Sequence, residues 1–304
     1  MKSLILAAAV LVVLVAAALG PLALGQGGEP AKAATAPASA PTAGVAKETW
    51  DWPAAMKSAA KKFTGTPGVV LFLGDSITYA NQATAWGRNV ARGATGHTDS
   101  DKEILKWSHA YEGEKDTNGW FLAAVDRPDG RSETASGITT AQYLKGGFHG
   151  LPSLAEILKK YNPQVVVILL GANDVNGGRK PDEVAADMKA ILQACLDNGA
   201  IPVLQTATPI RGRDDKVQAV NQKYLALAAE LKVPIIDLHG EFLTRQPGTA
   251  WEGTLVGGDG IHLTFVAANG PPTEENLKNS GYLLRCWLAV QKLKEVKAKV
   301  IDAK

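Results

Sequence analysis

A serine, a histidine and an aspartate of this chain stand in short motifs that suit nucleophilic chemistry. Ser76 lies in the sequence Gly-Asp-Ser-Ile-Thr (74–78), directly after the apolar run 69–73. A serine hydroxyl is a poor nucleophile unless a base takes its proton. His262 can be that base, because Asp259 precedes it by three residues in a turn and can reach its near ring nitrogen. Each motif alone is also compatible with an ordinary turn.

An asparagine follows a second apolar run. The sequence Gly-Ala-Asn-Asp (171–174) comes directly after the run 165–170. Its Asn173 amide could donate a hydrogen bond to a negatively charged oxygen that forms during a reaction. Because ligands bind at the carboxyl ends of parallel strands, we expect Asn173 and Ser76 at the same edge of one sheet.

The elements that must position these residues alternate between strand and helix. Such alternation predicts a doubly wound, mostly parallel sheet with helices on both faces. Apolar runs predict strands at 69–73, 165–170, 201–206 and 233–238. Amphipathic periodicity and end signals predict helices at 154–161, 181–196, 214–231 and about 273–299.

The three motifs, in this order and at this spacing, resemble blocks of the SGNH (GDSL-type) hydrolase superfamily. The resemblance covers about residues 68–290 and implies a serine esterase on a flavodoxin-like three-layer α/β/α sandwich that needs no metal or organic cofactor. It also implies roles: Ser76 as nucleophile, His262 as general base and acid, and Asp259 as orienting carboxylate. The Ser76 N–H and the Asn173 amide would be oxyanion donors.

The family's remaining block is a glycine whose N–H completes the oxyanion hole. Gly137, in the sequence Ser-Gly-Ile-Thr-Thr (136–140), is the best candidate. The asparagine often found just upstream of this glycine in the family is missing, and the gap from the nucleophile is long. Gly130, Gly146 and Gly147 therefore stay open as alternatives.

The N-terminus has the features of a targeting segment. A lysine at position 2 precedes an apolar run from residue 4 to 19, and small residues follow before residue 26. We interpret 1–25 as a signal peptide, with an uncleaved N-terminal anchor as the alternative. An Ala- and Pro-rich linker is expected at 26–48, and the hydrolase domain at 49–304. The domain is therefore expected to be exported, periplasmic or extracellular.

Two segments of the predicted domain are interpreted as insertions, at about 81–134 and 265–279. Both begin beside predicted site loops, so we expect them to shape a substrate cleft. Candidate substrate-binding residues are Trp86, Trp107, Trp120 and Arg211. The tryptophans could stack on sugar rings, or they could fill a small satellite core. The arginine could hold an anionic group, or it could lie in a solvated loop.

Composition excludes several other classes. The 304 residues carry a formal net charge of +2, which does not indicate a nucleic-acid surface. The two cysteines, Cys195 and Cys286, lie in apolar contexts and are expected to be buried free thiols, although export would permit a disulfide. No Cys/His cluster has the spacing of a metal site.

These observations favour a serine ester hydrolase acting on a small-molecule or polysaccharide ester, with O-acetyl groups on carbohydrate as the expected substrate. A lipase, lysophospholipase or thioesterase for longer acyl chains is the alternative within the enzyme class. A non-catalytic glycan-binding module on the same scaffold is the alternative outside it. No stable membrane contact is expected unless the N-terminal segment is an uncleaved anchor.

Overall fold

The computed structural model describes residues 48–79, 82–90, 93–109 and 134–303. The chain divides into two units, 1–39 and 40–304, and the first lies wholly outside the described residues. The predicted signal peptide, and all of the predicted linker except Glu48, also lie outside them. Glu48 belongs to the fold, since its carboxylate accepts hydrogen bonds from the Ile235 N–H and the Trp52 indole.

Four parallel strands form one sheet in the order β1-β2-β3-β4. Their bounds are Val70–Gly74, Val165–Leu169, Ile201–Gln205 and Ile235–Ile236. Every residue of these strands is buried, as expected for strands covered on both faces. The predicted α/β fold with a parallel sheet is therefore confirmed, although the last strand is shorter than predicted.

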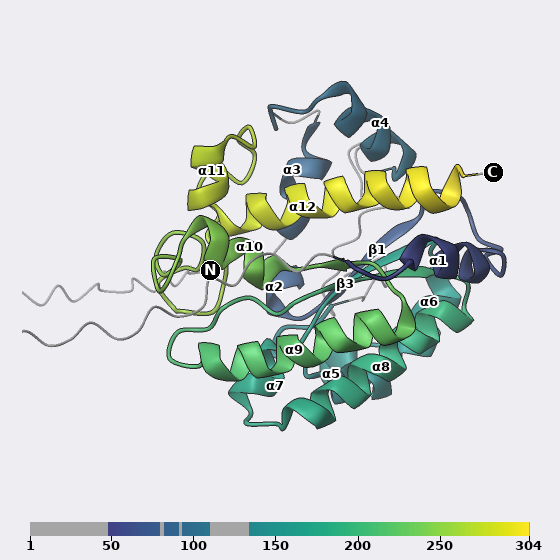
Figure 1. The fold of residues 1–304 in the computed structure, drawn as a ribbon, viewed down its shortest axis with the longest axis horizontal. Helices are drawn as coiled ribbons and strands as arrows, with labels where there is room; N and C mark the ends of the chain where they lie inside the picture. The colour runs from purple at the N-terminus through teal and green to yellow at the C-terminus, as the bar shows by residue number, and fades with distance from the viewer. Residues whose placement is uncertain (1–47, 80–81, 91–92, 110–133, 304) are drawn as a thin grey trace, which may run out of the picture. The chain divides into compact units, whose positions relative to one another are not determined.

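Helices cover both faces of the sheet (Figure 1). One face carries at least one helix from each connection between successive strands, and the sequential strand order places such right-handed crossovers on one side. They are α5 (Thr140–Lys145), α6 (Leu154–Tyr161), α8 (Pro181–Asp197) and α9 (Asp214–Leu231). The other face carries the long helix α12 (Gly281–Val296), and α3 (Ala85–Arg88) and α4 (Asp99–Trp107) pack against α12.

Short helices occupy the loops and the two ends of the described fold. They are α1 (Trp52–Ala60), α2 (Ser76–Tyr79), α7 (Ala172–Asn176), α10 (Leu238–Arg245) and α11 (Glu274–Asn279), with 3₁₀ turns at Gln82–Thr84 and Phe148–Gly150. A π-helical turn, η4 (Lys297–Ile301), continues α12 and contacts α1. No helix in the described ranges combines the length and apolar character needed to cross a bilayer.

The predicted helix at 273–299 is two helices. The chain breaks at Ser280, which has extended φ and ψ of −136° and 101°. Gly281 packs so tightly there that a Cβ atom on it would lie 2.1 Å from the Leu255 carbonyl oxygen. Its N–H also donates to Thr264 Oγ1 (3.0 Å), so contact with a remote loop ends the first helix.

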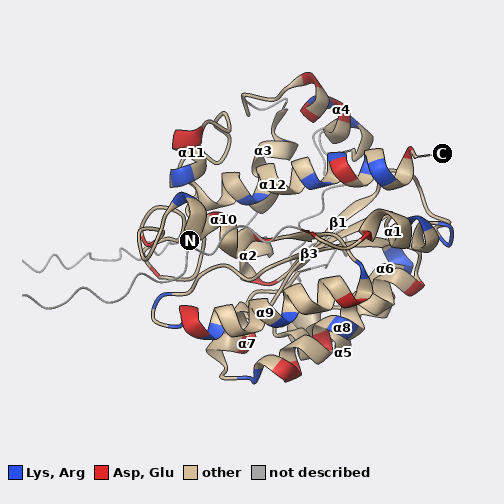
Figure 2. Cartoon of the chain, in the orientation of Figure 1, with Lys and Arg blue, Asp and Glu red and all other residues tan. Residues whose placement is uncertain are grey.

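Acidic and basic residues both occur along α8, α9 and α12 (Figure 2). The two cysteines are buried and free, as the sequence indicated. Burial raises the pKa of each thiol to about 12, so neither is a reactive thiolate at neutral pH.

Candidate active site

Ser76 stands at the carboxyl end of β1, where the strand turns directly into α2. The turn is held by Asp75, whose carboxylate accepts the Ile77 N–H at 3.0 Å and whose carbonyl accepts the Thr78 N–H at 3.0 Å. Asp75 is 1% exposed, whereas Ser76 is half-buried and reaches solvent. Burial raises the pKa of Asp75 to about 6, so this buried carboxyl is easily protonated.

His262 and Asp259 come to Ser76 from a loop near the end of the fold. His262 Nε2 lies 2.9 Å from Ser76 Oγ, and His262 Nδ1 lies 2.6 Å from Asp259 Oδ2. The other Asp259 oxygen accepts the Ile261 and His262 N–H groups at 3.0 Å each. The three predicted side chains therefore form one hydrogen-bonded chain.

The loop of His262 is tightly closed. Val256 and Leu263 pair across its base, and the Gly257 N–H donates to the His262 carbonyl at 2.7 Å. Gly260 has a φ of +77°, a conformation that residues with a side chain rarely adopt. This closure places the carboxylate and the imidazole on the same side of the loop, toward the nucleophile.

Arg211 braces this loop and does not present a free cation to a substrate. Its backbone N–H donates to the Gly260 carbonyl and its guanidinium to the Gly258 carbonyl, each at 2.9 Å. The guanidinium also pairs with Glu252. The hydrogen bonds of Arg211 therefore serve the loop that carries the histidine, and its predicted substrate contact stays a prediction.

Asp259 is held in its ionised form. Partial burial acts to raise its pKa, but hydrogen bonds from the Ile261 N–H and from His262 outweigh this and lower the pKa below its usual value. An ionised carboxylate on Nδ1 fixes the imidazole tautomer that leaves Nε2 free to accept the serine proton. The three side chains can therefore activate the Ser76 hydroxyl.

Two backbone N–H groups of the predicted oxyanion hole are available. Among the described residues, neither the Ser76 N–H nor the Gly137 N–H donates to a protein acceptor. Gly137 is exposed and has a φ of +82°, and a Cβ atom on it would lie 3.8 Å from the Phe148 ring. Of the alternative glycines, Gly146 and Gly147 both donate their N–H groups within the fold, and Gly130 lies outside the described residues.

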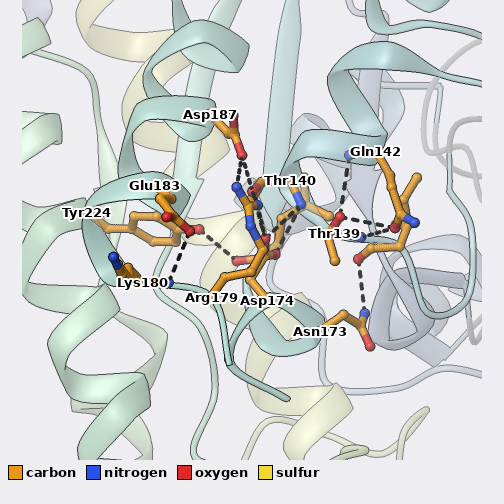
Figure 3. Close-up of polar contacts among 12 residues, drawn as sticks. Thr139, Thr140, Gln142, Asn173, Asp174, Arg179, Lys180, Glu183, Asp187 and Tyr224 are labelled. Atoms are coloured by element: carbon orange, nitrogen blue, oxygen red, sulfur yellow. Dashed lines mark hydrogen bonds and ion pairs between the residues drawn. The ribbon is translucent and has the colours of Figure 1, made fainter. Parts of the chain in front are cut away.

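The Asn173 amide lies between the Ser76 turn and the Gly137 segment. Its Nδ2 lies 3.1 Å from the Ile138 carbonyl oxygen and 3.3 Å from Asp75 Oδ2. Asn173 thus ties β1 to the segment after residue 134, and Figure 3 shows it beside the start of α5. In the absence of substrate its amide hydrogens point to protein oxygens, so a substrate oxygen must share or replace these contacts.

Two of the predicted tryptophans, Trp86 and Trp107, do not line this site. Trp86 is fully buried, stacks on His97 and donates its indole N–H to the Thr95 carbonyl. The Trp107 carbonyl packs against Gly68, before β1, which is the opposite end of the strand from Ser76. Both predicted sugar contacts are thus corrected to packing positions, and Trp120 lies outside the described residues.

Two exposed aromatic side chains near the triad in sequence were not among the predicted site residues. Tyr79 is the last residue of α2 and is 37% exposed, and Phe265 follows His262 by three residues and is 67% exposed. Their positions beside the two motifs were the available signal. Within the described ranges, no group of three or more His, Cys, Asp or Glu residues could hold a metal ion.

The model of the GDSL-like lipase/acylhydrolase family matches residues 72–265. The chain belongs to this family. The match spans the nucleophile, the Asn173 loop and the histidine, so the local geometry and the family assignment coincide. No curated protein matches this GDSL-family chain.

Several solved structures are similar to this GDSL-family chain. "TesA" is 21% identical, with 74% of this chain and 99% of that chain covered and a TM-score of 0.47. The "acetyl xylan esterase AlAXEase" is 19% identical, with 73% and 98% covered and a TM-score of 0.47. A "carbohydrate esterase family 3" structure from Talaromyces cellulolyticus is 17% identical, with 78% and 100% covered and a TM-score of 0.49.

Proposed function

We propose that the chain is an exported serine ester hydrolase that removes short acyl groups, such as O-acetyl groups, from carbohydrate. One observation carries the catalytic part of the proposal. Ser76, His262 and Asp259 form a continuous hydrogen-bonded chain, with 2.9 Å and 2.6 Å between the reacting heteroatoms. This is the arrangement that nucleophilic catalysis by serine requires.

The proposed reaction has two halves. Ser76 Oγ attacks the ester carbonyl carbon while His262 Nε2 takes the hydroxyl proton. The tetrahedral oxyanion is stabilised by the N–H groups of Ser76 and Gly137 and by the Asn173 amide. Its collapse breaks the bond to the alcohol, which leaves with the proton from His262. Water then attacks the acyl-enzyme with His262 as base, and the acid leaves as Ser76 regains its proton.

The exposure of the site supports a short acyl group. The His262 and Asp259 side chains are 44% and 52% exposed, so the base and its carboxylate lie open to solvent. A long acyl chain would need an apolar channel that removes it from water, whereas an acetyl group needs little burial. An open site also admits an alcohol that is part of a large polymer.

The exposed rings of Tyr79 and Phe265 support a carbohydrate alcohol. Aromatic faces pack on the C–H faces of sugar rings, and these two residues flank the nucleophile and the base in sequence. Export is proposed from the apolar segment that follows Lys2. This segment lies outside the described residues, and it is independent of the argument for the chemistry.

The test is acetate release from acetylated xylan and acetylated glucomannan, together with p-nitrophenyl esters of rising chain length. Wild type is compared with Ser76→Ala. Serine-dependent release that favours the acetylated glycans supports the whole proposal. Serine-dependent turnover of long acyl chains alone would replace the substrate with a lipid or thioester. No turnover by either protein on any ester would favour a glycan-binding module.

A further inference from the structure

Two consecutive residues of α7 form hydrogen bonds with the segment that carries Gly137. Asn173 Nδ2 donates to the Ile138 carbonyl (3.1 Å). The next residue, Asp174, accepts the Thr140 N–H at 3.0 Å and the Thr140 hydroxyl at 2.8 Å. The two side chains therefore hold neighbouring peptide units of one segment, immediately after Gly137. Figure 3 shows Asn173 and Asp174 beside Thr139 and Thr140 of this segment.

The Asp174 carboxylate is fully buried and needs a cation. Arg179 supplies it: Nη1 donates to Asp174 Oδ1 (2.5 Å) and to Thr140 Oγ1 (2.9 Å). Nη2 donates to Asp187 Oδ2 (2.7 Å) on α8, and the Arg179 backbone N–H donates to the Asp174 carbonyl (3.0 Å). One guanidinium thus ties the start of α5 to α7 and α8, as Figure 3 shows.

The placement of this cluster has a consequence for catalysis. An oxyanion donor must lie within about 2.7–3.1 Å of the oxygen that becomes charged, so small displacements of the donor are costly. The Gly137 N–H has no protein acceptor among the described residues, so the peptide units on either side set its direction. Before it, the Ala135 N–H donates to the Gly74 carbonyl at the end of β1 (3.4 Å). After it, Asn173 and Asp174 hold the peptide units at Ile138 and Thr140.

We propose that Asp174 and Arg179 are positioning residues that fix the Gly137 N–H in the oxyanion hole through Thr140. The inference rests on the proposed ester hydrolysis. We call the hydrogen bonds among Asp174, Arg179 and Thr140 the clamp. Its loss displaces the Gly137 N–H, which acts mainly on the transition state, so kcat falls more than substrate affinity does. The role goes beyond stabilising helix packing, because the clamped segment leads directly to the site.

The experiment uses Arg179→Lys, Asp174→Asn and the pair Thr140→Val and Thr140→Ser in the full chain. Arg245→Lys is the matched control, because Arg245 also bridges two carboxylates, Glu241 and Glu274, but on α10 and α11. We measure kcat and KM on p-nitrophenyl acetate, inhibition by a boronic acid that forms a tetrahedral serine adduct, and thermal unfolding.

The expected result is a fall in kcat of at least tenfold for Arg179→Lys and Asp174→Asn, with KM within about twofold and weaker boronic acid inhibition. Thr140→Val, which removes the hydroxyl bound by Asp174 and Arg179, should lower kcat in the same way. Thr140→Ser keeps the hydroxyl and should retain activity. The control should lower Tm without changing kcat. Unchanged kcat in a folded Arg179→Lys variant, or a change in KM alone, would overturn the inference. Arg179→Lys keeps its charge and is partly exposed, so it tests the clamp even if Asp174→Asn does not fold.

Amide hydrogen exchange of peptides spanning 134–145 separates this inference from the proposed function, because it needs no turnover. Faster exchange at 137–140 in Arg179→Lys than in wild type supports the clamp. Unchanged exchange there overturns it, whether or not the wild type hydrolyses esters. A wild type without serine-dependent turnover would overturn the hydrolase proposal, and faster exchange in Arg179→Lys would then show only that these contacts hold the segment in place.

Discussion

The guanidinium of Arg285 lies fully buried beneath the nucleophile helix and donates to Thr78 Oγ1 at 2.9 Å. The same group donates to the Ile77 carbonyl (3.2 Å) and to Gln205 Oε1 (3.0 Å). Burial lowers the pKa of Arg285 to about 10, so it is still charged at neutral pH. A cation on α12 therefore holds the two residues that follow Ser76.

Replacing Arg285 by methionine should destabilise the fold strongly. The change leaves the Ile77 carbonyl, the Thr78 hydroxyl and Gln205 without their buried donor, so a loss of about 3 kcal/mol or more is expected. Urea unfolding measures it. Arg285→Lys is the control that keeps the charge but not the planar fork, and it should lose less. A loss below about 1 kcal/mol for the methionine variant would contradict this reading.

Gly260→Ala should displace the base. The residue has a φ of +77°, and a Cβ atom on it would lie 2.6 Å from Arg211 Cβ, so the loop must shift. We expect kcat to fall at least tenfold in steady-state ester hydrolysis. Gly258→Ala is the control, because a Cβ atom there meets nothing within 4 Å. Equal kcat in the two variants would show that the loop tolerates the shift.

Removing the base should abolish turnover and leave the fold intact. His262→Ala is expected to lose nearly all activity, and Asp259→Asn roughly 10⁴-fold in kcat, because the amide favours the wrong imidazole tautomer. Stopped assays measure the turnover, and thermal unfolding checks the fold. Wild-type turnover in His262→Ala would rule out the triad.

Asn173→Ala should lower kcat by roughly 10²–10³ with little change in KM, if the amide stabilises the oxyanion. The variant also loses the contacts to Asp75 and Ile138, so Tm should fall modestly. Asn176→Ala, on the same short helix, is the control and should keep its activity. A rise in KM alone would assign Asn173 to substrate binding instead.

Asp75 should make the stability of the fold depend on pH. Burial raises its pKa to about 6, while the Ile77 N–H and the charges of Arg285 and His262 oppose the rise and Asp174 adds to it. An unfolded chain ionises this group near pH 3.8, so between about pH 4 and 6 the folded protein binds more protons than the unfolded chain. The stabilising contribution is complete below this window and is lost as pH rises through it.

The comparison of wild type with Asp75→Asn isolates this effect from other carboxylates. Their difference in unfolding free energy should change by up to about 1.4 kcal/mol per pH unit in the window and stay level above pH 7. Urea unfolding at pH 4 to 8 gives the curve. A difference that is independent of pH would mean that Asp75 ionises normally in the folded state.

The sheet and the triad could be predicted because their signals are local. Each strand is a continuous apolar run, and Ser76, Asn173 and Asp259 with His262 lie in motifs a few residues long. The last strand was predicted too long because both ends of the predicted run bond to helices and not to β3. The Val233 N–H donates to the Ala228 carbonyl at the end of α9, and Asp237 caps α10.

The roles of Trp86, Trp107 and Arg211 could not be predicted because they depend on remote contacts. Trp86 lies in α3, which packs against α12, almost two hundred residues later in the chain. The sequence around Arg211 looks like that of a solvated loop arginine. Its partner, the Gly258 carbonyl, lies 47 residues later and is not indicated by any local pattern. The Asp174–Arg179 cluster was missed because nothing local marks Thr140 as its partner.

The long sequence separation of the site's contacts ties activity to complete folding. Ser76 meets His262 across 186 residues, and Thr78 meets Arg285 across 207. Contacts of such separation close slowly and late, because the loop-closing entropy must be overcome first. In a partly folded chain, β1 and its turn could form before α12 docks. Ser76 would then lack both its base, His262, and the Arg285 guanidinium that holds the turn. Ester hydrolysis should therefore appear during refolding only after the histidine loop and α12 have docked on the Ser76 turn.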